Sequence, residues 1–79
     1  MINWREFTAG DLHSRLETFQ QQLERGGLVA EDAFRMLDVI HTELEQQRGG
    51  QHATYARYAG MMRQLEQADA PLYEQVVAR

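Results

Sequence analysis

The chain has no cysteine, no lysine and only one proline among its 79 residues. Without cysteine, neither a disulfide framework nor a thiolate metal site can supplement its core. No window approaches the roughly 18 apolar residues that a membrane-spanning helix needs. The first residues, MINWREF, lack the basic start and apolar run of a signal peptide. We therefore expect a cytoplasmic protein that does not associate with membranes.

Motifs of enzyme chemistry are also missing. The sequence has no G-x-S-x-G, no glycine-rich phosphate loop and no H-E-x-x-H, and Ser14 is its only serine. We therefore predict no catalytic residue, no cofactor and no enzymatic activity.

Basic charge is scarce and unevenly placed. Eight arginines stand against twelve acids, and a formal net charge of -4 disfavours a general nucleic-acid binder. Residues 28–47 hold five acids and one arginine, whereas residues 48–65 hold three arginines and no acid. The basic segment either pairs with the acidic one, in the same chain or in a second copy, which we favour, or docks an acidic partner.

The segment 29-48 has the clearest helical period, and we expect it to be the central helix. Its apolar residues recur at spacings of three and four, as in an amphipathic helix. One stripe consists of Val29, Ala33, Met36, Ile40 and Leu44, and an adjoining stripe of Ala30, Phe34, Leu37 and His41. Two adjoining stripes make a face wide enough to contact two neighbouring helices.

A preceding helix is expected over residues 9-25. Thr8 and Asp11 have the spacing of a capping box, and Phe7 with Leu12 that of a hydrophobic staple. Leu12, Leu16, Phe19 and Leu23 then form a narrow apolar seam. Gly26-Gly27 provides a glycine C-cap and a short turn, so the two helices should form an antiparallel hairpin.

A third helix is predicted over residues 51-68 and a short final helix or tail over 71-78. The third has an apolar seam of Tyr55, Tyr58, Met62 and Leu65, widened by Ala59 and Met61. Gly60 in its middle indicates either a close helix approach or a kink. The break at Gly49-Gly50 is weaker, and helices 29-48 and 51-68 could instead be nearly continuous.

We predict an all-α fold, a small helical bundle in a single domain over 1-79.

Two histidines lie near carboxylates. Asp38-x-x-His41 has a spacing found in helical-bundle metal sites, with Glu45 one turn further. His13 and Glu17 have helical spacing and could meet this group across the hairpin. Bundle sites need several carboxylates facing inward. We favour a partly buried His41 at the helix edge and predict no metal.

The segment LETFQQQLERGGLVAEDAFRMLD, residues 16–38, is similar in layout to the helical hairpin of the exonuclease VII small subunit. That family also has a short helix, a glycine turn followed by leucine, and acids opening a second amphipathic helix. The resemblance covers about a third of the chain, and the residues from Gly49 onward do not continue it. It implies only that such hairpins can be accessory subunits without chemistry of their own.

A chain of this length buries only about 60–65% of its unfolded surface, so its core is small. We expect its apolar helix faces to be completed by another protein or a second copy. The predicted function is a non-catalytic protein-interaction module, an adaptor, accessory subunit or inhibitor, as a homodimer. Its predicted partner-binding residues are Trp4, Phe34, Tyr55, Arg57, Tyr58, Met62 and Arg63. Alternatives are a nucleic-acid accessory protein using the Arg/Tyr face of 51-68, and a metal-binding bundle.

The aromatic residues at the two ends of the chain admit two interpretations. Trp4, Phe7 and Tyr73 either fold over the helices and finish the core, or leave an aromatic patch for a partner. We favour the first, because small domains rarely leave aromatic area uncovered.

Overall fold

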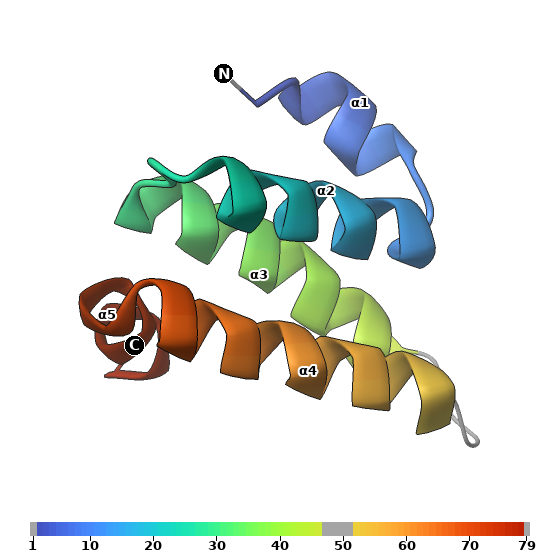
Figure 1. Ribbon diagram of the computed structural model, residues 1–79. Coiled ribbons are helices and arrows are strands. Elements are labelled where there is room, and N and C mark those ends of the chain that lie inside the picture. Colours follow the sequence, from blue (N-terminus) through green and yellow to red (C-terminus); the bar gives the residue numbers. More distant parts are fainter. Residues whose placement is uncertain (1, 47–51, 79) are drawn as a thin grey trace.

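The computed structural model describes residues 2–46 and 52–78, and these form five helices and no strand (Figure 1). The helices are α1 (Trp4–Ala9), α2 (Leu12–Arg25), α3 (Ala30–Gln46), α4 (His52–Ala68) and α5 (Ala70–Ala78). The predicted all-α class is confirmed. Within this described part, no helix is long and apolar enough to cross a membrane.

The predicted start of the first helix is wrong. The helix expected over 9-25 begins at Leu12 as α2, and a separate short helix, α1, precedes it. Asn3 caps α1, its side chain accepting from the Glu6 amide at 3.1 Å. Asp11 caps α2, accepting from the Ser14 amide at 2.8 Å. Thr8 is not a cap; it lies within α1, where its hydroxyl donates to the Trp4 carbonyl. Asn3-x-x-Glu6 was the sequence signal for α1, and it fits the capping-box pattern.

The glycine turn after α2 is confirmed. Gly26 and Gly27 have φ values of 81° and 77°, which L side chains rarely adopt. The chain reverses there, and α3 packs antiparallel to α2 (Figure 1). The short connection makes α2 and α3 the expected helical hairpin.

The centre of the fold is α2 rather than α3. α2 packs against α1, α3 and α4, whereas the main contacts of α3 are with α2 and α5. In Figure 1, α1 lies on one side of the hairpin and α4 on the other, while α5 turns back at the end of α4. The narrow seam of α2 therefore meets several neighbours, with Leu16 and Phe19 fully buried.

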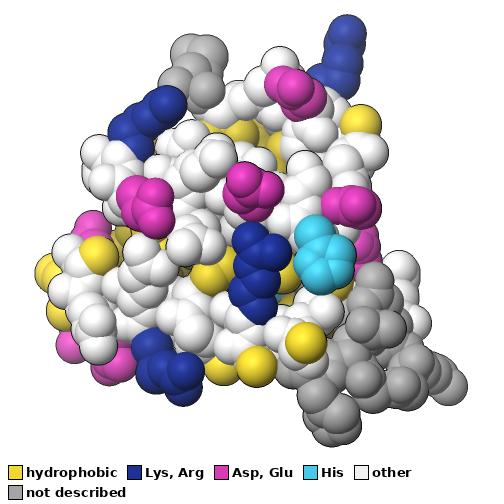
Figure 2. All heavy atoms as spheres, turned by 45° about the vertical axis from the view of Figure 1, so that its right-hand side comes forward, with side chains coloured by type: hydrophobic (Ala, Val, Ile, Leu, Met, Phe, Trp, Pro, Cys, Tyr) yellow, Lys and Arg dark blue, Asp and Glu magenta, His cyan; other side chains and the backbone are white. Residues whose placement is uncertain are grey.

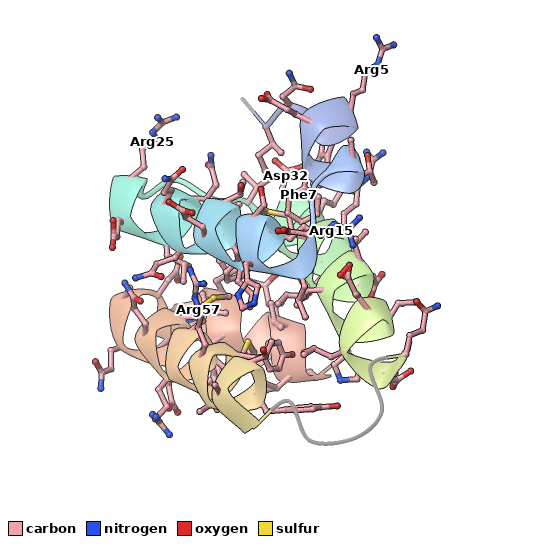
Figure 3. The ribbon with its side chains drawn as sticks, turned by 90° about the vertical axis from the view of Figure 1, so that its right-hand side faces the viewer. Arg5, Phe7, Arg15, Arg25, Asp32 and Arg57 are labelled. Carbon is pink, nitrogen blue, oxygen red and sulfur yellow. The ribbon has the colours of Figure 1, made fainter. Side chains whose placement is uncertain are left out.

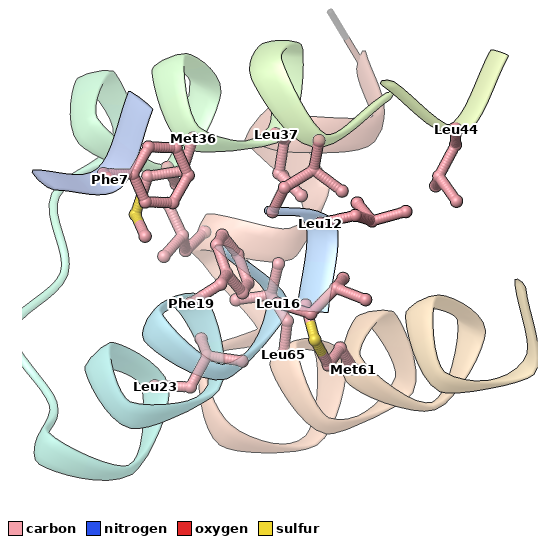
Figure 4. Close-up of a cluster of buried hydrophobic side chains, with 13 residues drawn as sticks. Phe7, Leu12, Leu16, Phe19, Leu23, Met36, Leu37, Leu44, Met61 and Leu65 are labelled. Atoms are coloured by element: carbon pink, nitrogen blue, oxygen red, sulfur yellow. The ribbon is translucent and has the colours of Figure 1, made fainter. Parts of the chain in front are cut away.

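Among the residues that the structure describes, thirteen apolar side chains form the core (Figure 4). They are Phe7, Leu12, Leu16, Phe19, Leu23, Ala33, Met36, Leu37, Ile40, Leu44, Met61, Leu65 and Leu72. The first stripe of α3 is thus confirmed from Ala33 onward. Val29 instead precedes the helix and is 55% exposed.

The apolar seam of α4 is shifted by about one residue from the predicted one. Thr54, Met61 and Leu65 are buried, Tyr58 and Met62 are half-buried, and Tyr55 is exposed. Thr54 is a polar residue, so an apolar pattern could not select it. A Cβ added at Gly60 would meet no atom within 4 Å, which excludes close helix approach as the reason for that glycine.

The final helix is confirmed. Asp69 caps α5, its side chain accepting from the Leu72 amide at 3.2 Å, and Leu72 reaches the core. Pro71 lies in the first turn, where its missing N–H costs nothing. The predicted helix end at Arg48 and the break at Gly49-Gly50 lie outside the described residues. α3 and α4 are separate helices that run in different directions (Figure 1).

Little apolar surface remains uncovered. Among the described residues, the large hydrophobic side chains that are well exposed are Val29, Tyr55 and Val77. On the face in Figure 2, apolar side chains form small separate patches between charges of both signs. The single chain therefore covers most of the apolar surface that we expected a partner to cover.

Candidate functional site

A hollow with a volume of about 610 Å³ lies between α3, α4 and α5. Its lining residues are Phe34, Leu37, Asp38, His41, Thr42, Tyr58, Val76 and Val77. We call it the α3–α5 groove. It brings together two of the predicted partner-binding residues, Phe34 and Tyr58.

The α3 wall follows from the helical period. Phe34, Leu37, Asp38, His41 and Thr42 recur at intervals of three and four, so they share one face. This face contains most of the second stripe predicted for the helix. Its polar members run along its length, and the Thr42 hydroxyl donates to the Asp38 carbonyl at 2.8 Å. The wall therefore combines apolar surface with a polar edge.

Tyr58 and the two valines form the opposite side. Burial raises the pKa of the Tyr58 phenol above its usual value of 10.0. Its ring centroid lies 6.1 Å from that of His41, with the two rings inclined at 51°. Val77 is 56% exposed, although it lines the groove. The groove thus offers an uncovered aliphatic side chain beside an aromatic ring.

His41 is more exposed than we predicted. Its side chain retains 58% of its accessible surface, and its Nδ1 lies 3.4 Å from Glu45 Oε1. Within the described ranges, no three His, Asp or Glu side chains are grouped so that they could hold a metal ion. Asp38, His41 and Glu45 lie on one helix, and His13 and Glu17 of α2 do not complete a site with them.

The other predicted residues of α4 do not share one face. Tyr55 is 46% exposed, and its hydroxyl donates to the Leu44 carbonyl at 3.0 Å. Met62 packs against the core cluster. Arg57 and Arg63 are six residues apart, so they leave the helix about 120° from each other. Figure 3 shows Arg57 directed toward α2. The expected continuous Arg/Tyr surface is therefore divided.

The favoured pairing of α4 arginines with α3 acids is also not found between described residues. The carboxylate contacts there join the Arg15 guanidinium to Glu43 and the His41 imidazole to Glu45. Arg57 and Arg63 make none with a described acid. Of the three arginines in the segment 48–65, the two that the structure describes, Arg57 and Arg63, do not form a common basic surface.

Trp4 contributes to the fold rather than to an open patch. Its ring packs against the core and lies edge-to-face with Phe7, with centroids 5.8 Å apart. The Arg35 guanidinium carbon lies 4.3 Å from the Trp4 ring centroid, in a cation–π contact. Tyr73 also packs against the core, so the favoured interpretation of the chain ends agrees with their packing.

Arg15 is a key residue that sequence reasoning missed. Its guanidinium joins α2 to carbonyl oxygens of α1 and to Glu43 of α3, 28 positions away in sequence. No local pattern connects these partners, because the contact depends on how the helices pack. Only its place beside the apolar seam, at the edge between α2 and its neighbours, could have drawn attention to it.

No protein-family model, curated protein or solved structure matches this chain. The layout similarity of residues 16–38 to the exonuclease VII small subunit therefore gains no support from these comparisons.

Proposed function

We propose that this chain is a small non-catalytic protein-interaction module that binds another protein through the α3–α5 groove. The observation that carries the proposal is the groove itself, where Val77 stays exposed beside Phe34 and Tyr58. Aromatic side chains in a partly enclosed apolar surface are typical anchors of protein interfaces.

The form of the groove favours an amphipathic helix as its occupant. Two packed helices and the end of a third surround it, and such grooves take apolar anchors at spacings of three and four. Phe34, Leu37 and His41 have that same spacing along one wall. The polar edge of α3 would contact the polar face of the bound helix and fix its orientation.

The homodimer remains part of the prediction, but its basis has changed. It rested on surplus apolar surface, but thirteen apolar side chains of the described part are buried within the single chain. What remains exposed is Val77 at the groove, together with a few separate side chains elsewhere. A second copy would therefore bind at the groove as a folded partner and not as a missing half of the core.

Two exposed valines allow a matched test. Val77 and Val29 are 56% and 55% exposed, but only Val77 lines the groove. Proteins captured from the native host by the chain, by Val77→Arg and by Val29→Arg would be compared by quantitative mass spectrometry. We expect a specific partner to be lost with Val77→Arg and retained with Val29→Arg. Equal capture by both variants would contradict a groove-bound partner.

A further inference from the structure

The amino-terminal helix α1 lies on one side of the body formed by the other helices (Figure 1). Phe7 is its one buried residue among those described, at 4% exposure, and points into the core (Figure 4). Trp4 packs beside Phe7 under the guanidinium of Arg35 from α3. The apolar attachment of α1 thus consists of two aromatic side chains spaced three residues apart, with Ile2 packed against the core just before the helix.

Arg15 holds the carboxyl-terminal end of α1. Its Nε donates to the Phe7 carbonyl at 3.1 Å and its Nη2 donates to the Thr8 carbonyl at 2.6 Å. Its Nη1 donates to Glu43 Oε1 at 2.6 Å, where both side chains are largely buried. A cation at this end also complements the helix dipole. One side chain of α2 therefore binds both α1 and α3 (Figure 3).

The remaining helices do not depend on α1 for their own ends. α2 begins with its own cap, Asp11, and the other buried apolar residues lie in α2 to α5. α1 has only six residues, too few to stay helical in water without packing. Its release would leave a core of four helices and expose the surface that Trp4 and Phe7 cover.

We propose that α1 can detach, and that the surface of α2 and α3 beneath it is a second protein-binding surface. While α1 is attached, the hydrogen bonds of Arg15 hold it over this surface. The partner that fits is a short helix with two aromatic residues three positions apart, as Trp4 and Phe7 are in α1. The partner's aromatic residue in the position of Phe7 would be buried in the core. The one in the position of Trp4 would stack against the Arg35 guanidinium. Arg15 supplies the donors for the last carbonyl groups of the incoming helix.

The role of Arg15 in holding α1 is tested by hydrogen exchange on the full chain and its Arg15→Gln variant. Amide exchange over residues 4–9 should rise about tenfold or more, while α2 to α4 keep their protection. Trp4 is the only tryptophan, so its fluorescence should shift to the red at the same time. Arg63→Gln, an exposed arginine without a described ion-pair partner, is the matched control. Unchanged exchange, or loss of protection throughout the chain, would overturn the proposal.

The surface is tested with a labelled peptide of residues 2–10. In the native chain the tethered α1 has a high effective concentration and should exclude the peptide. In the full-length Phe7→Ala variant, which keeps Arg15, the peptide should bind at least about tenfold more tightly. A peptide carrying the same Phe7→Ala change should not bind. Equal affinity for both proteins, binding to neither, or failure of Phe7→Ala to fold would each count against the proposal.

Discussion

At the residue scale, the glycines illustrate how position decides whether a side chain can be added. Gly26 has φ 81° and ψ 169°, a backbone region that is almost restricted to glycine. Gly60 lies within α4, and a Cβ there meets no atom within 4 Å. The same substitution should therefore have opposite effects at the two sites.

Gly26→Ala should lower the free energy of unfolding by about 1–3 kcal/mol, because alanine must adopt a strained backbone. Gly60→Ala should raise it by about 0.5–1 kcal/mol, because alanine has the higher helix propensity and open space for its methyl group. Urea unfolding of both variants beside the native chain measures the two changes. A stabilising Gly26→Ala or a destabilising Gly60→Ala would contradict the assigned backbone geometry.

Ionisation of Tyr58 should make the free energy of unfolding fall at alkaline pH. Burial raises its pKa in the folded chain above the unfolded value of 10.0. The folded state therefore retains its proton where the unfolded state has lost it, and unfolding free energy falls as pH rises through that interval. Below pH 10.0 this contribution is fully present.

Tyr58→Phe should remove that part of the alkaline decline, whereas the exposed Tyr55→Phe should leave it in place. Unfolding free energies measured from neutral to alkaline pH for the three proteins test this. An identical pH profile for native chain and Tyr58→Phe would show that the Tyr58 phenol does not carry the effect.

At the element scale, the sequence predicted helices wherever a strong period and a glycine end coincided. The seam of α2, the Gly26-Gly27 turn and the stripe of α3 follow from spacing alone. The start predicted for the first helix was wrong because Thr8 and Asp11 both fit a cap, and only the path of the chain decides between them. The apolar seam predicted for α4 was wrong because Thr54 is buried and Tyr55 is exposed, and their burial depends on packing against other helices.

The two rival caps can be compared directly. Asp11→Ala should lower unfolding free energy by about 0.5–2 kcal/mol, because the Ser14 amide loses its acceptor. Thr8→Ala should cost less than about 0.5 kcal/mol, since its exposed hydroxyl adds only a local bond within α1. Chemical denaturation gives both values. A larger loss from Thr8→Ala would restore the cap predicted from the sequence.

At the scale of the whole molecule, the groove was only partly predictable. Phe34 and His41 were expected on one stripe, and Tyr58 was expected as an anchor. These residues lie beside Val76 and Val77 because α5 packs against α3. No residue spacing in the sequence indicates that packing. The same packing, together with α1, covers apolar surface that we had assigned to a partner.

The account depends most on one claim, that a single chain closes its own core and needs no second copy to fold. Equilibrium unfolding over a wide range of protein concentration, with light scattering at each concentration, tests it directly. We expect light scattering to show a folded monomer at low concentration, with one cooperative transition whose midpoint does not change with concentration in that range, because a single copy loses no subunit contact on unfolding. A midpoint that rises with concentration, with a dimer as the smallest folded species, would contradict the account.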